Sequence, residues 1–237
     1  MNKTKDFHLK QFSIYGGHSG MAVSTDGILL GAWANISNPN HSSILDIGTG
    51  TGLLALMCAQ RSQQSQITAI DIDDDAIKAA QYNVDNSPWS KRIKVIKAPA
   101  QQLKSKQQFD HIVCNPPYFN SGVTSDWQAR ATARHTHTLP HSELLIACAK
   151  LLTPSGSANF ILPKAEGEAF IQLALEQGWF VKRLCQVNTT EHKPGYRLLF
   201  TLTRDQTECQ NSQLTIHQAD GYSAPFIQLT RDFYLKM

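Results

Sequence analysis

The sequence predicts an α/β protein built on a doubly wound, mostly parallel sheet of seven strands. Short apolar runs with strand character alternate along the chain with longer segments of helical periodicity, and this alternation is typical of parallel sheets with helical crossovers. A glycine-rich turn, Gly48–Gly52, separates one such strand from the helix after it. Another strand, at residues 109–114, ends in a proline-rich turn. Because parallel strands end at one edge of a sheet, both turns should open onto the same crevice.

Residues 1–42 are predicted to form an N-terminal extension that ends in a helix. Polar and apolar residues alternate at 7–14, which predicts extended structure before glycines interrupt it. Thr25 and Asp26 offer an N-cap to an apolar helix at 27–34, and Asn38-Pro39-Asn40 should end that helix.

Residues 43–204 are predicted to form the α/β domain. Strands are expected near 43–47, 66–71, 92–96, 109–114, 158–162, 179–187 and 196–203, with helices near 53–61, 73–86, 141–152 and 165–177. Asp73 can cap the helix that follows it. The last two strands should form a hairpin at one edge of the sheet. Residues 205–237 are expected to be a C-terminal extension packed on the same domain, with a weak strand at 213–217.

Composition excludes some classes of protein and leaves others open. A content of 41% hydrophobic and 17% charged residues in 237 is ordinary for a globular protein. No apolar run approaches the roughly 18–20 residues of a membrane span, and no signal-peptide core follows the first residues. Five cysteines without a CxxC pair predict reduced thiols and a cytoplasmic location. The net charge of +3 permits a polyanionic partner without demanding one.

The glycine loop and a downstream acid predict a nucleoside ligand. Gly48, Gly50 and Gly52 form a GxGxG pattern, and glycine lets a ligand approach the backbone because it has no Cβ. Asp71 ends the next strand about 20 residues on, where a carboxylate can accept both hydroxyls of an adenosine ribose. A plain tight turn and a helix-capping acid are the alternatives. NAD and S-adenosylmethionine share this ribose, so the two features alone leave the ligand open.

Asn115-Pro116-Pro117-Tyr118 favours the methyl donor. The prolines fix φ and end the strand, so the chain leaves the sheet in a rigid loop. The Asn115 side-chain oxygen and the Pro116 carbonyl can both accept from an exocyclic amine, which turns the nitrogen lone pair toward a methyl group. Tyr118 can stack on an extruded base, an interaction worth about 1–3 kcal/mol. An ordinary proline turn is the alternative, but the motif follows a glycine loop and a ribose acid and therefore indicates methyl transfer to an amine.

Asp46–Gly52, Asp71 and Asn115–Tyr118, in this order and spacing, resemble the class I S-adenosylmethionine-dependent methyltransferases that act on amino nitrogens. The run from Thr25 to Trp33, preceded by Lys10-Gln11-Phe12-Ser13-Ile14, is similar to the bacterial tRNA1(Val) adenine-N6 methyltransferases. The resemblance covers nearly the whole chain, and it implies that residues 1–42 form a cap segment that covers the donor site. It implies S-adenosylmethionine as cofactor and, as substrate, the N6 of adenine 37 in the anticodon loop of a valine tRNA.

The motifs and the resemblance together assign roles to individual residues. Asn115, Pro116 and Tyr118 are expected to be catalytic. The donor is expected to contact Lys10, Met21, Thr25, Asp46, Gly48, Gly50, Gly52, Asp71, Ile72, Gln101 and Asn115. The RNA is expected to contact Pro117, Tyr118, Phe119, Arg130, Arg134, Lys193 and Arg197. Many relatives have an acid after the third strand; here Ala98-Pro99-Ala100-Gln101 stands there, so Gln101 or backbone groups would replace it.

Histidines and further basic residues fit an RNA-facing surface better than a metal site. His135, His137 and His141 could suggest zinc, but the sulfonium of the donor is already activated and the reaction needs no metal. Lys182 and Arg183 near the last strands could also meet phosphates, although each can equally be ordinary surface. The expected partners are therefore tRNA and the donor, with no membrane, metal or obligate protein partner.

Three rival functions stay open at this point. The nearest is methylation of another amine: guanine N2 of rRNA, adenine N6 of DNA or a protein glutamine. A nicotinamide-dependent oxidoreductase would share the glycine loop and the acid but has no use for the proline motif. A non-catalytic RNA-binding module would bind tRNA without consuming the donor.

Overall fold

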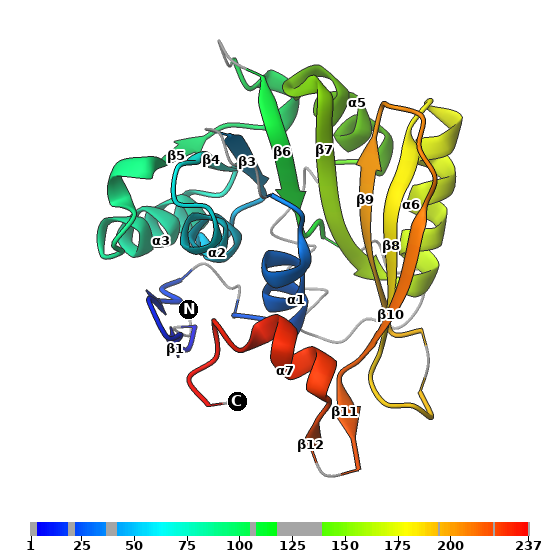
Figure 1. Ribbon diagram of the computed structural model, residues 1–237. Helices are drawn as coiled ribbons and strands as arrows, with labels where there is room; N and C mark the ends of the chain where they lie inside the picture. Colours follow the sequence, from blue (N-terminus) through cyan, green and yellow to red (C-terminus); the bar gives the residue numbers. More distant parts are fainter. Residues whose placement is uncertain are drawn as a thin grey trace.

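An eight-stranded sheet runs through the centre of the molecule in the order β10-β8-β9-β7-β6-β3-β4-β5 (Figure 1). The computed structural model describes residues 4–18, 22–36, 42–104, 108–117, 139–193, 195–219 and 221–236. The strands of the sheet are β3 (Ser43–Ile47), β4 (Gln66–Asp71), β5 (Ile93–Lys97), β6 (Phe109–Cys114), β7 (Leu152–Pro163), β8 (Phe180–Asn188), β9 (Arg197–Thr203) and β10 (Gln210–Thr215). All pairs are parallel except those that β9 makes with β7 and β8.

Each of the seven predicted strands is present, but the predicted strand count was wrong by one. β10 pairs in parallel with β8 from Gln210 to Thr215, so the β8–β9 hairpin is not the edge of the sheet. The sequence signal for β10 is weak because its first four residues, Gln210 to Gln213, are polar and exposed. A polar edge strand discourages pairing with other chains.

Helices cover both faces of the sheet, as the doubly wound class requires. They are α1 (Thr25–Trp33), α2 (Leu53–Arg61), α3 (Asp74–Asp85), α5 (His141–Leu151), α6 (Lys164–Glu176) and α7 (Ala224–Thr230), with short 3-10 turns η1 (Ser90–Arg92) and η2 (Ala100–Gln102). One apolar cluster joins α1, α2 and Val84 of α3 to one face, and another joins α5 and α6 to the opposite face. Successive strand residues alternate between them: Ile44 belongs to the first cluster and Leu45 to the second.

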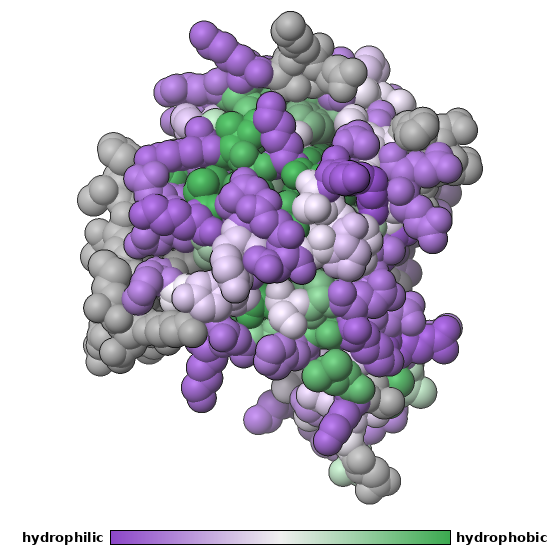
Figure 2. Space-filling model, turned by 90° about the vertical axis from the view of Figure 1, so that its left-hand side faces the viewer, coloured by the Kyte–Doolittle hydropathy of each residue, from purple (hydrophilic) through white to green (hydrophobic). Residues whose placement is uncertain are grey.

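Seen from the side that carries α3 and β5, the surface is mostly hydrophilic, with apolar side chains gathered in a few recesses (Figure 2). None of the helices in the described ranges is long and apolar enough to cross a membrane. All five cysteines are free thiols, and four of them are buried, as expected from their sequence context.

Helix α1 begins with a different cap from the predicted one. The Ser24 hydroxyl, not Thr25 or Asp26, accepts from the Gly27 N–H at 3.1 Å. Asp26 is buried and instead accepts from Arg197. Asp73 caps α3 as predicted, because its carboxylate accepts from the Ala76 N–H at 2.8 Å. The predicted stop at 38–40 lies outside the described residues.

Arginines bind the carbonyl groups at several chain turns. Arg61 donates to the carbonyls of Gly31 and Ala34 at 2.8 and 2.7 Å. Arg92 donates to one carbonyl in the last turn of α2 and to two in the loop between α2 and β4. Arg183 donates to the Trp33 carbonyl at 3.3 Å, with its guanidinium over the indole. Helix ends leave carbonyls without intrahelical partners, and the guanidinium groups supply the missing donors.

The two ends of the chain lie side by side (Figure 1). The strands β1 (Phe7–His8) and β2 (Ser13–Ile14) pair with each other, and Leu9 forms an isolated bridge with Tyr234. The Lys10 N–H donates to Phe233 at 2.8 Å, and Phe233 and Phe226 share the core of α1 and α2. The short strands β11 (His217–Gln218) and β12 (Gly221–Tyr222) form a hairpin before α7. The division at residues 42 and 204 stays a prediction.

Gly31 allows α1 to pack tightly against α2. A Cβ at Gly31 would overlap Sδ of Met57 and would lie 2.8 Å from its Cε, closer than unbonded atoms approach; the Met57 Cβ, at 3.0 Å, would be a tight contact. Met57 is fully buried, so it has little room to withdraw. The glycine in the run from Thr25 to Trp33 is therefore a packing requirement.

We expect Gly31→Ala to lower the free energy of unfolding by about 1–3 kcal/mol, because overpacking outweighs the helix propensity of alanine, which is worth about 1 kcal/mol. Urea unfolding measures the change. In a Met57→Ala background the same substitution should cost much less, since the sulfur and terminal methyl are gone. Equal costs in the two backgrounds would contradict the packing argument.

Candidate active site

Three predicted site segments meet at the carboxyl edge of the sheet. Ile47, the last residue of β3, pairs with Ile70 of β4 and with Cys114 of β6. The glycine loop, Asp71 and Asn115 are therefore level with one another on adjacent strands. This is the crevice in which ligands of open α/β sheets bind.

The glycine loop requires glycine at three positions. Gly48, Gly50 and Gly52 have φ of 71°, 55° and 83°, a region that other residues rarely adopt. A Cβ on Gly48 would meet nothing within 4 Å, so this backbone faces open space. A Cβ on Gly52 would lie 3.4 Å from Cα of Ala80, which links the loop to α3. The first glycine can face a ligand, and the third serves packing.

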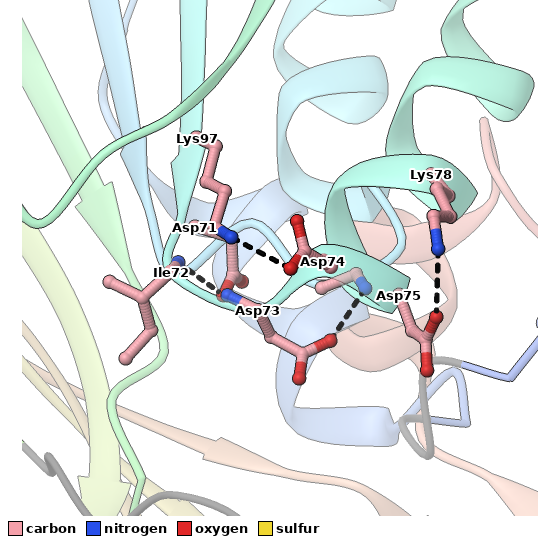
Figure 3. Close-up of polar contacts among 8 residues, drawn as sticks. Asp71, Ile72, Asp73, Asp74, Asp75, Lys78 and Lys97 are labelled. Atoms are coloured by element: carbon pink, nitrogen blue, oxygen red, sulfur yellow. Dashed lines mark hydrogen bonds and ion pairs between the residues drawn. The ribbon is translucent and has the colours of Figure 1, made fainter.

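Asp71 holds the glycine loop and the chain after β4 together. One carboxylate oxygen accepts from the Gly50 N–H at 2.9 Å. The other accepts from the N–H groups of Ile72 and Asp73 at 2.8 and 3.0 Å (Figure 3). A carboxylate can accept about four hydrogen bonds, so these three leave capacity for a ligand hydroxyl. Asp73 caps α3, and the capping alternative for Asp71 therefore has no support. Ile72 points away from these acids and is 40% exposed.

Asp46 is a buried acid, and one of its two carboxylate oxygens has no hydrogen-bond donor among the described residues. Thr49 Oγ1 and the Ala55 N–H donate to Oδ2 at 2.6 and 3.1 Å, while Oδ1 has no partner among the described residues. Burial raises the pKa of Asp46 from 3.8 to about 7; the two hydrogen bonds act in the opposite direction and the charge of Asp71 adds to the rise. An unpartnered buried oxygen costs free energy and marks a place for a donor group.

Asn115 also presents an unpartnered acceptor. Its Oδ1 is buried and has no hydrogen-bond partner among the described residues. Pro116 is buried and Pro117 is exposed. The amide follows β6 directly, so the sheet fixes its position at the edge beside Asp46 and the glycine loop.

Several predicted contacts lie outside the described residues: Met21, Tyr118, Phe119, Arg130, Arg134, His135 and His137. Thr25 is the first residue of α1. Lys10 Nζ donates to the Arg231 carbonyl at 2.5 Å, and Gln101 of η2 donates to Glu143 at 2.8 Å. Lys193 is exposed in the turn between β8 and β9. Their proposed ligand contacts stay predictions.

Arg197 and His141 have structural partners that the sequence did not indicate. Arg197 Nε donates to Asp26 at 2.7 Å, and both side chains are largely buried. The His141 ring packs edge-on against Phe170 at 4.8 Å, and burial lowers its pKa. Within the described ranges, no group of three or more histidine, cysteine, aspartate or glutamate residues could hold a metal ion.

Sequence reasoning missed Asn83, which ties the N-terminal segment to the glycine loop. This buried side chain accepts from the Tyr15 N–H and donates to the carbonyls of Tyr15 and Thr51, at 2.8, 3.0 and 2.8 Å. Its position on the same side of α3 as Ala76, Ala79 and Ala80 was an available signal, since a polar residue on an apolar helix face needs partners.

Comparison with known proteins agrees with this geometry. The family model described as "Methyltransferase small domain" matches residues 28–161. A tRNA1(Val) (adenine(37)-N6)-methyltransferase of Vibrio campbellii is 55% identical over 235 residues, covering 99% of this chain and 98% of that protein. This chain belongs to that methyltransferase family. The resemblance stated from the motifs is thereby confirmed.

Solved structures support the fold of this family member. A protein of Agrobacterium tumefaciens, described as a predicted O-methyltransferase, is 16% identical and aligns with a TM-score of 0.69 over 88% of this chain and 96% of that one. A Listeria monocytogenes protein assigned to the class I S-adenosylmethionine-dependent methyltransferases is 16% identical and aligns with a TM-score of 0.57, over 79% and 62% of the two chains. At such identities the likeness shows the fold alone.

Replacing Asp46 with asparagine should remove a pH dependence of stability. The folded protein binds the Asp46 proton more tightly than the unfolded chain, so the wild-type free energy of unfolding falls as pH rises from about 4 to about 7. The asparagine oxygen can still accept from Thr49 and Ala55, and it has no proton to lose.

Urea unfolding at pH 5 and pH 8 compares the two proteins. We expect the stability of Asp46→Asn relative to wild type to rise by about 1–3 kcal/mol between these pH values. A difference that stays constant with pH would show that Asp46 ionises normally in the folded protein.

Proposed function

We propose that this methyltransferase transfers a methyl group from S-adenosylmethionine to N6 of adenine 37 in tRNA1(Val). The observation that carries the proposal is the buried Oδ1 of Asn115, which has no partner within the described part of the chain and lies at the sheet edge that also holds the glycine loop. The printed name of a relative identical at 55% of positions supports the same reaction and RNA. Because tRNA is the substrate, we propose the cytoplasm as the location.

The residues at the crevice fit the donor. Asp46 Oδ1, which lacks a partner among the described residues, suits the ammonium group of the methionine part of the donor. Asp71 has capacity left for a ribose hydroxyl, and the exposed Ile72 beside it can pack against the adenine. Gly48 leaves room for close approach to the backbone. When bound, the donor supplies a methyl group on a positively charged sulfur.

Asn115 and Pro116 would orient the substrate amine. An adenine amine has two protons, and the Asn115 Oδ1 and the Pro116 carbonyl can each accept one. When both amine protons are hydrogen-bonded in this way, the nitrogen becomes more tetrahedral and its lone pair turns toward the methyl group. Positioning of this kind can supply most of the acceleration. To reach these acceptors the adenine must leave its stack in the anticodon loop.

The direct test uses tRNA from a strain that lacks this gene. The protein is incubated with that tRNA and methyl-labelled S-adenosylmethionine, and the nucleosides are then separated. We expect label in N6-methyladenosine from a valine tRNA. Absence of label in tRNA, together with label in rRNA, DNA or a release factor, would move the assignment to another amine.

Asn115→Ala should reduce turnover about 100-fold or more, because the amine loses an orienting acceptor. The variant should keep nearly all of the thermal stabilisation that S-adenosylmethionine gives the wild type, since Asp46, Asp71 and the glycine loop supply other expected donor contacts. Asn86→Ala is the control: Asn86 is exposed at the end of α3, where it bonds the Tyr82 carbonyl. Normal turnover in Asn115→Ala would refute the role of the amide.

A further inference from the structure

An exposed tyrosine stands at the carboxyl edge of the sheet, apart from the residues assigned to the donor and the amine. Tyr196 is 42% exposed, and its N–H donates to the Val187 carbonyl at 2.9 Å. The next residue, Arg197, pairs with Pro163 at the end of β7, whereas Asn115 follows the β6 residue that pairs with Phe160. Tyr196 is thus two strands across from Asn115, about 10–15 Å away at ordinary strand spacing.

The ring of Tyr196 rests on a fixed support. The Arg197 guanidinium carbon lies 3.8 Å from the ring centre, and Nη1 donates to the Tyr196 carbonyl at 3.0 Å. Nε of the same guanidinium donates to Asp26 at 2.7 Å, in an ion pair whose side chains are 15% and 7% exposed. A guanidinium is attracted to an aromatic face. Asp26 of α1 therefore holds Arg197, and Arg197 in turn supports the Tyr196 ring in the free protein.

Two lysines belong to the surroundings of the turn that carries Tyr196. Gly195 has a φ of 74°, and a Cβ there would lie 2.8 Å from Cδ and 3.4 Å from Nζ of Lys164, so the ammonium group lies beside the turn. Lys193 is exposed in the same turn. Glu168 is 3.9 Å from Lys164, and both side chains are about half exposed, so this pair is weak. An exposed aromatic ring in a turn with ammonium groups nearby suits a nucleobase and its phosphates.

The C-terminal segment braces the turn that carries Tyr196. The N–H groups of Ile216 and His217 donate to the carbonyls of Asn188 and Thr189 at 2.9 and 3.0 Å. The Asn188 side chain in turn accepts from the Gly195 N–H at 2.8 Å. The β11–β12 hairpin and the β8–β9 turn therefore extend side by side from the carboxyl edge (Figure 1).

We propose that Tyr196 is a stacking platform for an unpaired base next to the target adenine, and that Arg197 positions the ring. The inference rests on the proposed function and names the RNA contact that accompanies it. Tyr118 is the predicted stacking partner of the target base itself, and Tyr196 stands too far from Asn115 to share that base. The distance fits a neighbouring nucleotide in the loop.

The test uses an anticodon stem-loop RNA with 2-aminopurine next to the target adenine, because the fluorescence of this base reports stacking. Tyr196→Ala should weaken RNA binding about 5- to 100-fold and abolish the change in fluorescence, whereas Tyr196→Phe should retain both. Donor binding should be unchanged. Tyr82→Ala is the matched control: Tyr82 is 53% exposed on α3 and should bind the RNA normally.

The role of Arg197 is tested with the double variant Asp26→Asn, Arg197→Gln, which removes both charges and leaves neither partner as a buried lone ion. We expect it to weaken RNA binding, and we expect Tyr196→Ala to cost less in this background than in the wild type. Strictly additive effects would overturn the positioning role.

Two results would overturn the stacking role while leaving the proposed function intact. One is normal RNA affinity and fluorescence in Tyr196→Ala. The other is a loss of turnover with unchanged fluorescence of the neighbouring base, which would mean that Tyr196 contacts the target adenine. If the wild type fails to methylate tRNA at all, the proposed function itself fails, and the two failures are thereby distinguished.

Discussion

The carboxylate of Asp71 is the contact on which the candidate site depends. It accepts from the glycine loop after β3 and from the first two residues after β4, so it joins two strand ends through three hydrogen bonds. The loop backbone has positive φ at three positions, a conformation that most residues rarely adopt. Without this carboxylate nothing else described at the sheet edge would accept from the Gly50 N–H. The ribose acid of the motif is thus also the residue that shapes the loop.

The site combines satisfied and unsatisfied polar groups in a consistent way. Groups that shape the backbone have their partners: Asp71 with the loop, Asn83 with Tyr15 and Thr51, Asp26 with Arg197. At the crevice, one oxygen of Asp46 and one of Asn115 have no partner among the residues that the structure describes. Buried unpaired acceptors lower the stability of the free protein, and proteins tolerate such features mainly at functional sites.

The sequence predicted those features that depend on interactions between residues close together in the chain. The positions of seven strands along the chain, the Asp73 cap and the glycine loop follow from local spacing and backbone geometry, and the structure has them. Partnerships across long separations were not predictable: Arg197 looks like surface charge because nothing near it in the chain indicates Asp26, which is 171 positions away. β10 was only weakly indicated because its stability comes from pairing with β8 and not from apolar side chains. The Ser24 cap was missed because three adjacent residues all have capping side chains.

The arginines that bind carbonyl groups change how the net charge should be interpreted. Within the described ranges, five of the six arginines donate to backbone carbonyls: Arg61, Arg92, Arg183, Arg197 and Arg204. These guanidinium groups are bound to the chain itself, and the exposed lysines Lys164 and Lys193 add positive charge to the described surface near Tyr196. An ammonium group is a point charge without the planar fork that reads paired acceptors. This surface can therefore attract a phosphate backbone but cannot distinguish one sequence from another by charge, which leaves discrimination to ring faces and amide oxygens.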